Sequence, residues 1–179
     1  FGAIMSPDEI ELQPVTHIVV DAIGPPGKRV FYLQGWQDDR TVTLIVEKFQ
    51  IQSLAIGLEQ FLIEIEEKNP DLSPASADYT EDNMHILPPV DPLFRVGELG
   101  LGYDQDNDLL ILVAREQTRD EEDPEDIRVV RFWCTRSQLR AMSSWGIEIA
   151  SRGRPLCPQC REPMDPEGHF CPKKNGHNH

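Results

Sequence analysis

The sequence predicts an α+β fold in which an antiparallel sheet carries helices on one face. Short segments rich in alternating apolar and β-branched residues come in groups of three, and after each group the apolar residues recur at the period of a helix. Strand groups separated by single helices favour an antiparallel sheet covered by helices. At 179 residues, the chain is long enough for one well-buried core and a small appendage.

The first group spans residues 16–68, after an N-terminal segment at 1–15. Its predicted strands are 16–23 (THIVVDAI), 29–36 (RVFYLQGW) and 41–48 (TVTLIVEK), separated by a Gly-Pro-Pro-Gly turn and a polar hairpin turn. The next segment predicts a helix of about four turns, because its apolar residues form a single stripe. The stripe consists of Ile51, Leu54, Ala55, Leu58, Phe61, Leu62 and Ile65.

A proline-rich connector at 69–93 leads to the second group, at 94–152. Strands are predicted at 94–100, 108–114 and 127–134, with an acidic loop before the last one. A helix then opens at Thr135, with Gln138 at the spacing of a capping box. The same order of elements occurs twice, and some of the same amino acids recur at equivalent positions. The sequence therefore predicts two strand-strand-strand-helix repeats that arose by internal duplication.

The net charge of −14 is unevenly distributed. Residues 152–179 carry five basic and three acidic side chains, so the preceding residues hold the whole excess of negative charge. A field of that sign repels phosphate backbones and anionic lipids, so we expect neither a nucleic acid nor a membrane as partner. We find no apolar run of membrane-spanning length and no secretory signal, and we expect a cytoplasmic protein. We take Met5 as the start and leave residues 1–4 out of the argument.

The segment 153–179 contains a motif typical of a zinc site. Three of the four cysteines and three of the five histidines fall within residues 157–179. Cys157 and Cys160 are separated by two residues, and Cys171 follows a turn sequence, which is how short segments supply tetrahedral ligands. We expect His169 to be the fourth ligand because it stands two residues before Cys171, with His177 as the alternative.

Two rival interpretations of this segment are a redox pair and an unliganded tail. A thioredoxin-like Cys-x-x-Cys motif opens a helix after a strand, and the sequence around Cys157 shows neither. Three thiolates and one imidazole would fill the coordination shell of Zn²⁺, whereas catalysis needs an open position for water. The sequence therefore predicts a structural zinc knuckle.

A second candidate site is a set of polar residues at predicted strand ends and at the first strand-to-helix turn. These residues are Arg29, Gln34, Glu47, Lys48 and Gln50. They could line a pocket for a small charged molecule, and the alternative is a salt-bridged surface. We expect Cys134 to be a buried small side chain. His17 and His85 stand alone in the sequence, away from any nucleophile motif.

Four segments of the sequence resemble a known family. They read GPPGKRVFYLQ, VEKFQ, FRVGELGLGYD and CPQCREPMDPEGHFCPKKNGH. Together they resemble an uncharacterised bacterial family from Actinobacteria and Chloroflexi, described only as a domain of unknown function. The resemblance runs from about Glu11 to His177 and implies that Cys157, Cys160, His169 and Cys171 occupy the tail motif. It also implies a phosphate-related pathway with kinase-like or phosphatase-like proteins as partners, but no reaction.

These observations favour a non-catalytic module whose zinc-bound tail docks a protein partner. The alternative is an enzyme that acts on a small phosphorylated or charged metabolite, with Arg29, Gln34 and Lys48 in its pocket and zinc purely structural. A third hypothesis is that zinc only fastens the C-terminal segment onto the body.

Overall fold

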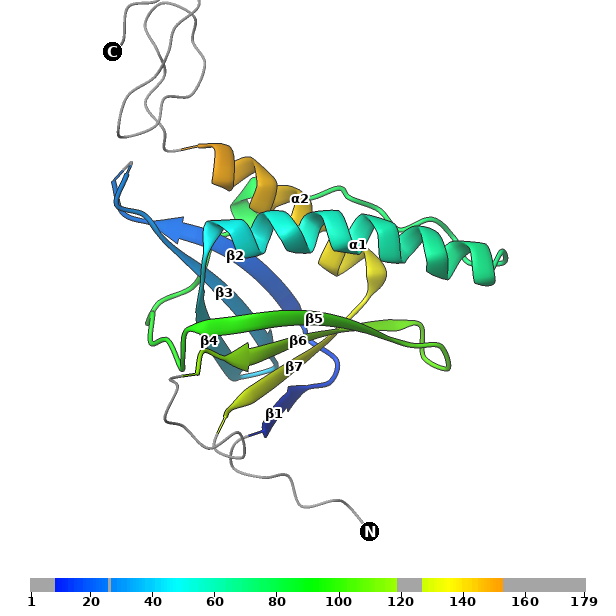
Figure 1. Cartoon of the computed structure of the whole chain (residues 1–179), viewed down its shortest axis with the longest axis horizontal. Helices are drawn as coiled ribbons and strands as arrows, with labels where there is room; N and C mark the ends of the chain where they lie inside the picture. Colours follow the sequence, from blue (N-terminus) through cyan, green and yellow to red (C-terminus); the bar gives the residue numbers. More distant parts are fainter. Residues whose placement is uncertain (1–8, 26, 119–126, 153–179) are drawn as a thin grey trace, which may run out of the picture.

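A computed structural model describes residues 9–25, 27–118 and 127–152, which form two sheets and two α-helices (Figure 1). Among these residues, no helix is both long and apolar enough to cross a membrane. The elements are β1 (Glu9–Leu12), β2 (His17–Ile23), β3 (Val30–Gln37), β4 (Arg40–Val46), α1 (Lys48–Lys68), a 3-10 turn η1 (Glu81–Asn83), β5 (Val96–Asp104), β6 (Leu109–Glu116), β7 (Val129–Cys134) and α2 (Arg136–Ser151).

The three-stranded sheet has the order β2-β3-β4 and is antiparallel throughout. Its strands lie within about two residues of the predicted segments, so this part of the prediction is confirmed. The turn between β3 and β4 holds Asp38 at φ 53°, in the left-handed region that tight hairpin turns require.

The four-stranded sheet has the order β1-β7-β6-β5 and is mixed, because β1 runs parallel to β7. The prediction of purely antiparallel pairing is therefore wrong for this one pair, and the number of sheets, which the sequence left open, is two. The missed strand, β1, lies within the segment 1–15. Four residues are too few to display a period, and the partner of Glu9, Val129, lies about 120 residues away.

Backbone hydrogen bonds link the two sheets on both sides. Between β1 and β2, the amide of Val15 donates to β7 and the amide of Thr16 donates to β3. On the other side, Ile45 of β4 donates to the carbonyl of Phe94, just before β5. The two sheets therefore curve around one shared interior, which both helices cover (Figure 1).

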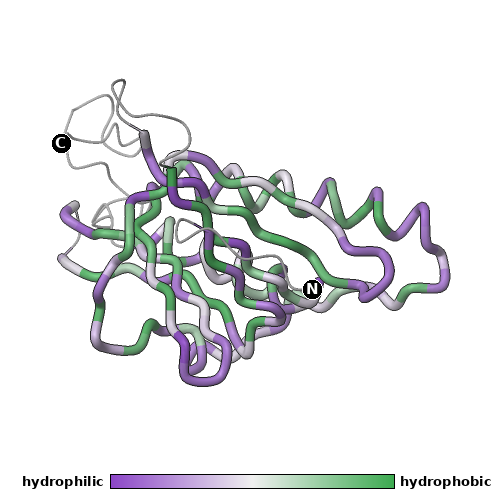
Figure 2. Tube along the Cα trace, turned by 90° about the horizontal axis from the view of Figure 1, so that it is seen from below, coloured by the Kyte–Doolittle hydropathy of each residue, from purple (hydrophilic) through white to green (hydrophobic). Residues whose placement is uncertain are grey.

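That interior is filled by the inward faces of the strands and by the buried stripes of α1 and α2. The largest fully buried side chains include Trp145, Phe132, Leu12, Leu58 and Met142. Figure 2 shows hydrophilic residues at the strand-to-strand turns and hydrophobic stretches along the strands. The helices approach closely because Gly146 of α2 faces α1, where an added Cβ would lie 2.7 Å from Ile51 Cγ2.

The capping box predicted at the start of α2 is confirmed. The Thr135 hydroxyl accepts a hydrogen bond from the Gln138 amide at 3.0 Å, and the Thr135 amide donates to Gln138 Oε1 at 2.8 Å. At the start of α1 the Glu47 amide donates in the same way to Gln50 Oε1, at 2.8 Å. Glu47 and Gln50 have the same three-residue spacing as Thr135 and Gln138, and they form a second capping box.

The connector 69–93 wraps the body without forming a strand. Its first part lies on α2, where the Ser73 and Ala75 carbonyls accept hydrogen bonds from Arg136 and Arg140. Its later part covers the outer face of β2 and β3. The order strand-strand-strand-helix occurs on both sides of this connector, and the internal duplication that it suggests stays a prediction.

Candidate functional site

All of the predicted zinc ligands lie outside the described residues. They are Cys157, Cys160, His169 and Cys171, with His177 as the alternative to His169. The ligand set therefore stays a prediction. Within the described ranges, no three His, Cys, Asp or Glu side chains are grouped so that they could hold a metal ion. Cys134 is fully buried, as predicted, and burial raises the pKa of its thiol far above the usual value.

Gln34 is buried and serves as a structural link. Its amide group donates to the Thr43 hydroxyl and to the Leu87 carbonyl, both at 3.0 Å, and its Oε1 accepts from the Leu87 amide at 2.8 Å. These contacts fix the connector on the outer face of β3. Because both ends of the side chain are satisfied, Gln34 faces the connector and not the beginning of α1.

The structure brings Glu47, Lys48 and Gln50 together in the turn between β4 and α1. Gln50 is buried, and its Nε2 donates to the Val96 carbonyl at 3.1 Å. The Glu47 carboxylate pairs with Arg95 at 2.6 Å, and both side chains are about half exposed. These contacts join the start of α1 to the start of β5.

The remaining residue of the predicted pocket, Arg29, precedes β3 at the end of the β2-β3 hairpin. Its Nε is buried, and it has no hydrogen-bond partner among the described residues. Thus three of the five predicted residues share one location, Gln34 occupies another, and a pocket formed by all five stays a prediction.

A groove of about 290 Å³ opens between α1 and β5, which lie side by side in Figure 1. We call it the α1-β5 groove. It is lined by Phe49, Gln50, Ser53, Leu54 and Gly57 of α1 and by residues 97–101 of β5. Among these lining residues, Glu98 carries the one charged side chain.

The β5 side of this groove is a strand edge. The strand pairs with β6 on one side, and it is the last strand in the sheet order β1-β7-β6-β5. On its other side, the described backbone forms a bridge just before the strand, between Arg95 and Ile45. In an edge strand, every second residue turns its N–H and C=O away from the sheet, here toward the groove.

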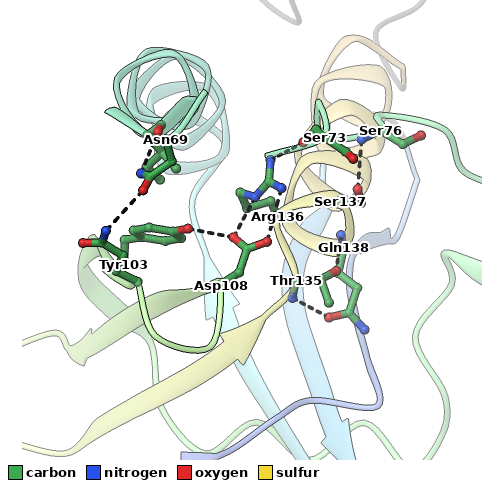
Figure 3. A network of polar contacts seen from close by, with 11 residues as sticks. Asn69, Ser73, Ser76, Tyr103, Asp108, Thr135, Arg136, Ser137 and Gln138 are labelled. Atoms are coloured by element: carbon green, nitrogen blue, oxygen red, sulfur yellow. Dashed lines mark hydrogen bonds and ion pairs between the residues drawn. The ribbon is translucent and has the colours of Figure 1, made fainter. Parts of the chain in front are cut away.

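Side-chain amides connect the two ends of α1 to the two ends of β5. At the beginning of the helix, Gln50 donates to the Val96 carbonyl, and at its end Gln105 donates to Asn69 Oδ1 at 3.2 Å. Asn69 in turn donates to the carbonyl of Ile65, within the last turn of α1 (Figure 3). The two elements are therefore held together at both ends of the helix, and the groove opens near the first of these contacts, between residues 49–57 and 97–101.

Figure 3 also shows the polar network that anchors the far end of β5. The Tyr103 hydroxyl donates to Asp108 at 2.8 Å, and the buried guanidinium of Arg136 donates to both oxygens of the same carboxylate. Burial raises the pKa of Tyr103 to about 12, and the Asp108 hydrogen bond adds to that rise. Burial also disfavours the Asp108 carboxylate, but hydrogen bonds from Arg136 and Tyr103 outweigh it and hold its pKa below the usual value.

A second cavity, of about 440 Å³, lies on the outer face of the four-stranded sheet, and we call it the outer basin. It borders the α1-β5 groove, because Glu98, Gly100 and Leu101 line both. Its further lining residues are Glu11, Gly102, Ile111, Val113, Arg115, Arg131 and Trp133.

Three glycines along the groove and the basin have no steric reason to be glycine. A Cβ added at Gly57 or Gly100 would meet nothing within 4 Å, and one at Gly102 would make ordinary contacts with Ile111 at 3.8 Å. None of the three has positive φ. A glycine inside a helix or strand costs about 0.5–1 kcal/mol relative to alanine, so such glycines suggest that another molecule approaches closely.

The sequence could have revealed part of this site. Gly97 and Gly100 fall within the predicted strand 94–100 and Gly102 follows it directly, which is an unusual concentration of glycine for a strand. The edge position of β5 was not predictable, since it depends on the order in which distant strands pair.

The structure also groups two histidines that the sequence analysis treated as isolated. His17 and His85 line a cavity of about 330 Å³ together with Trp36. His85 Nδ1 lies 3.2 Å from an Asp21 carboxylate oxygen, and His17 Nε2 lies 2.6 Å from the Asn83 carbonyl oxygen. More than 60 residues separate the partners in each pair, so spacing gives no signal for this cluster.

In two of the three comparisons with known proteins, those with curated proteins and with solved structures, nothing matches the chain. A family model described as "Protein of unknown function (DUF3090)" matches residues 10–171, which is most of the sequence and includes the groove and the outer basin. The resemblance noted from the sequence segments is confirmed at this level, and the chain belongs to the DUF3090 family of proteins of unknown function.

Proposed function

We propose that the protein is a non-catalytic docking module that binds an extended segment of a partner protein by strand addition to β5. The observation that supports this function is the edge of β5, which has no strand partner among the described residues and lines an open groove opposite α1. An added strand would receive main-chain hydrogen bonds from β5 and side-chain contacts from the helix. This combination is a recurring mode of peptide recognition.

The lining of the α1-β5 groove fits such a segment. Inward side chains of the added strand would meet Leu54 and Phe49 of α1, and Phe49 is 63% exposed in the free protein. Gly57 leaves room on the helix for these side chains. The single charged lining residue is Glu98, and the protein is strongly acidic, so the partner segment carries lysine or arginine near that position.

The open edge has a physical cost that binding would remove. Unpaired N–H and C=O groups on a long strand edge invite aggregation, and proteins usually cover, charge or shorten such edges. Here β5 extends from Val96 to Asp104, and α1 stands beside its edge, where Gln50 donates to the Val96 and Gly97 carbonyls at the beginning of the strand. A partner strand would satisfy these groups.

The C-terminal segment belongs to the same proposal. Cys157, Cys160, His169 and Cys171 hold a structural Zn²⁺, with His177 as the substitute for His169, and the knuckle is a second docking element. Two features of the sequence support this second element. The cysteine and histidine residues have the type and spacing of zinc ligands, and the segment carries a net positive charge beside an acidic body. Structural zinc contributes about 10–16 kcal/mol in comparable peptides, which is enough to fold so short a segment.

The test begins by selecting binders for the full-length protein from a displayed library of random linear peptides of about nine residues, enough to pair along β5. Each selected peptide is then N-methylated at one residue at a time, and its affinity is measured by fluorescence anisotropy. Strand addition predicts that affinity falls about tenfold at every second residue, where a donor to β5 is lost, and is nearly unchanged between them. No enriched peptide family, or losses without a period of two, would contradict the proposal.

Two full-length variants locate the binding. Gly57→Leu places a side chain in the α1-β5 groove from a Cβ that meets nothing within 4 Å, so it should abolish peptide binding while the helix becomes more stable. Gln52→Leu adds the same side chain at an exposed α1 position outside the groove lining and should bind normally. Cys157→Ser should leave groove binding intact, whereas peptides that bind the tail would be lost.

A further inference from the structure

We infer that the partner segment carries an aromatic side chain that lies over Gly100 or Gly102 and reaches into the outer basin. This inference rests on the proposed strand addition to β5 and names the residue type that the site selects. It comes from the composition of the two faces of β5. Leu99, Leu101 and Tyr103 turn toward the interior, and the intervening positions open outward as glycine.

Cross-strand geometry places the aromatic group. Side chains directly opposite each other on adjacent strands lie about 4.5–5.5 Å apart on the same face. A residue of the added strand opposite Gly100 or Gly102 therefore has no neighbouring side chain on β5. Its ring can lean across the glycine, which is how aromatic residues cover glycines in sheets.

Beyond the glycines, the next two strands supply an apolar floor. Gly100 pairs with Val113 and Gly102 pairs with Ile111 on β6, and Ile111 pairs in turn with Trp133 on β7. These three side chains are half-buried in the free protein. The basin of about 440 Å³ is within the range of cavities that hold small organic ligands, roughly 300–1,000 Å³, so an aromatic ring has ample space.

A guanidinium at the rim favours an aromatic over an aliphatic group. Arg115 is exposed and lines the basin, and its side chain has no hydrogen bond or ion pair within the described residues. Arg131, which also lines the basin, has one long ion-pair contact among the described residues, at 3.7 Å to Glu9. A guanidinium with no fixed partner can stack on an aromatic face, where the ring quadrupole attracts it.

The experiment uses the full-length protein and the peptides selected for the α1-β5 groove. We expect the enriched family to carry Phe, Tyr or Trp at a position whose side chain faces outward. The variants Gly100→Val and Gly102→Val place a side chain where the aromatic ring would lie over the glycine. Valine is favoured in strands, and the space around both glycines accepts a Cβ. Thr41→Val, at an exposed position of β4 outside both cavities, is the matched control.

We expect a double-mutant cycle to show coupling between the glycine position on β5 and the aromatic residue of the peptide. One of the two valine variants should weaken the aromatic peptide about three- to tenfold, and the same peptide with that residue changed to Ala should bind both proteins equally. Arg115→Gln should produce a smaller loss, again only with the aromatic peptide. Thr41→Val should change nothing.

Two outcomes would overturn the inference while leaving strand addition intact. The first is an N-methyl scan with a period of two but no aromatic preference, and the second is equal weakening of the aromatic and alanine peptides. If the period of two is missing, the proposed function fails as well. A third outcome, a dimer in sedimentation that Gly100→Val dissociates, would identify a second copy of this chain as the occupant and would contradict a partner peptide.

Discussion

Gly35 offers the sharpest test of how the two sheets pack. It lies in β3 and faces the four-stranded sheet, where an added Cβ would be 2.7 Å from two ring carbons of Phe132 and 3.6 Å from Leu12 Cδ1. Both neighbours are fully buried, so the ring cannot move into solvent. Gly35→Ala must therefore displace a packed aromatic ring, and overpacking of this kind costs about 1–3 kcal/mol.

For a chain of this length, 1 kcal/mol changes Tm by about 2–4 °C, so Gly35→Ala should lower Tm by roughly 2–12 °C. The assay is thermal and urea unfolding followed by far-UV circular dichroism. Gly100→Ala is the matched control, because nothing lies within 4 Å of its added Cβ, and it should be neutral or stabilising by up to about 1 kcal/mol. Equal stability of the two variants would refute the packing of β3 against β7.

Three further predictions concern single groups. Spectrophotometric titration should show a tyrosine that ionises near pH 12, and Tyr103→Phe should remove it; a titration curve without this component would be contrary evidence. Because the folded pKa of Asp108 lies below its unfolded value, its contribution to stability is present above the unfolded pKa, about 3.9, and is lost as pH falls through the folded pKa. Asp108→Asn should therefore destabilise the protein most at pH 7 in urea titrations, with a loss that shrinks as the pH is lowered below the unfolded pKa, and a loss independent of pH would contradict this. Elemental analysis should find one zinc per chain, lost in Cys157→Ser, whereas metal-free protein would exclude the knuckle.

Much of the fold could be predicted from local patterns. Six of the strands and both helices follow from period, turn residues and the capping box at Thr135. The pairing order could not be predicted, because it depends on contacts between distant segments. The parallel pairing of β1 with β7 and the contact of Gly35 with Phe132 are both of this kind.

Only some residues of the candidate site could be predicted from the sequence. Glu47, Lys48 and Gln50 were expected to lie near a site because they occupy a strand-to-helix turn, and the structure places Gln50 at one end of the α1-β5 groove. Gln34 was grouped with them, but its alternation along β3 puts it on the opposite face, under the connector. A polar residue in a strand can equally line a site or hold a loop, and only its partners distinguish the two.

The most direct measurement of the central claim is amide hydrogen exchange by NMR on the full-length protein, with and without a saturating selected peptide. Strand addition to β5 predicts new protection at alternate residues between Glu98 and Tyr103, those whose N–H groups point away from β6, with the intervening amides unchanged. Protection confined to the outer surface of α1 or to the C-terminal segment, or no change in β5, would contradict the account.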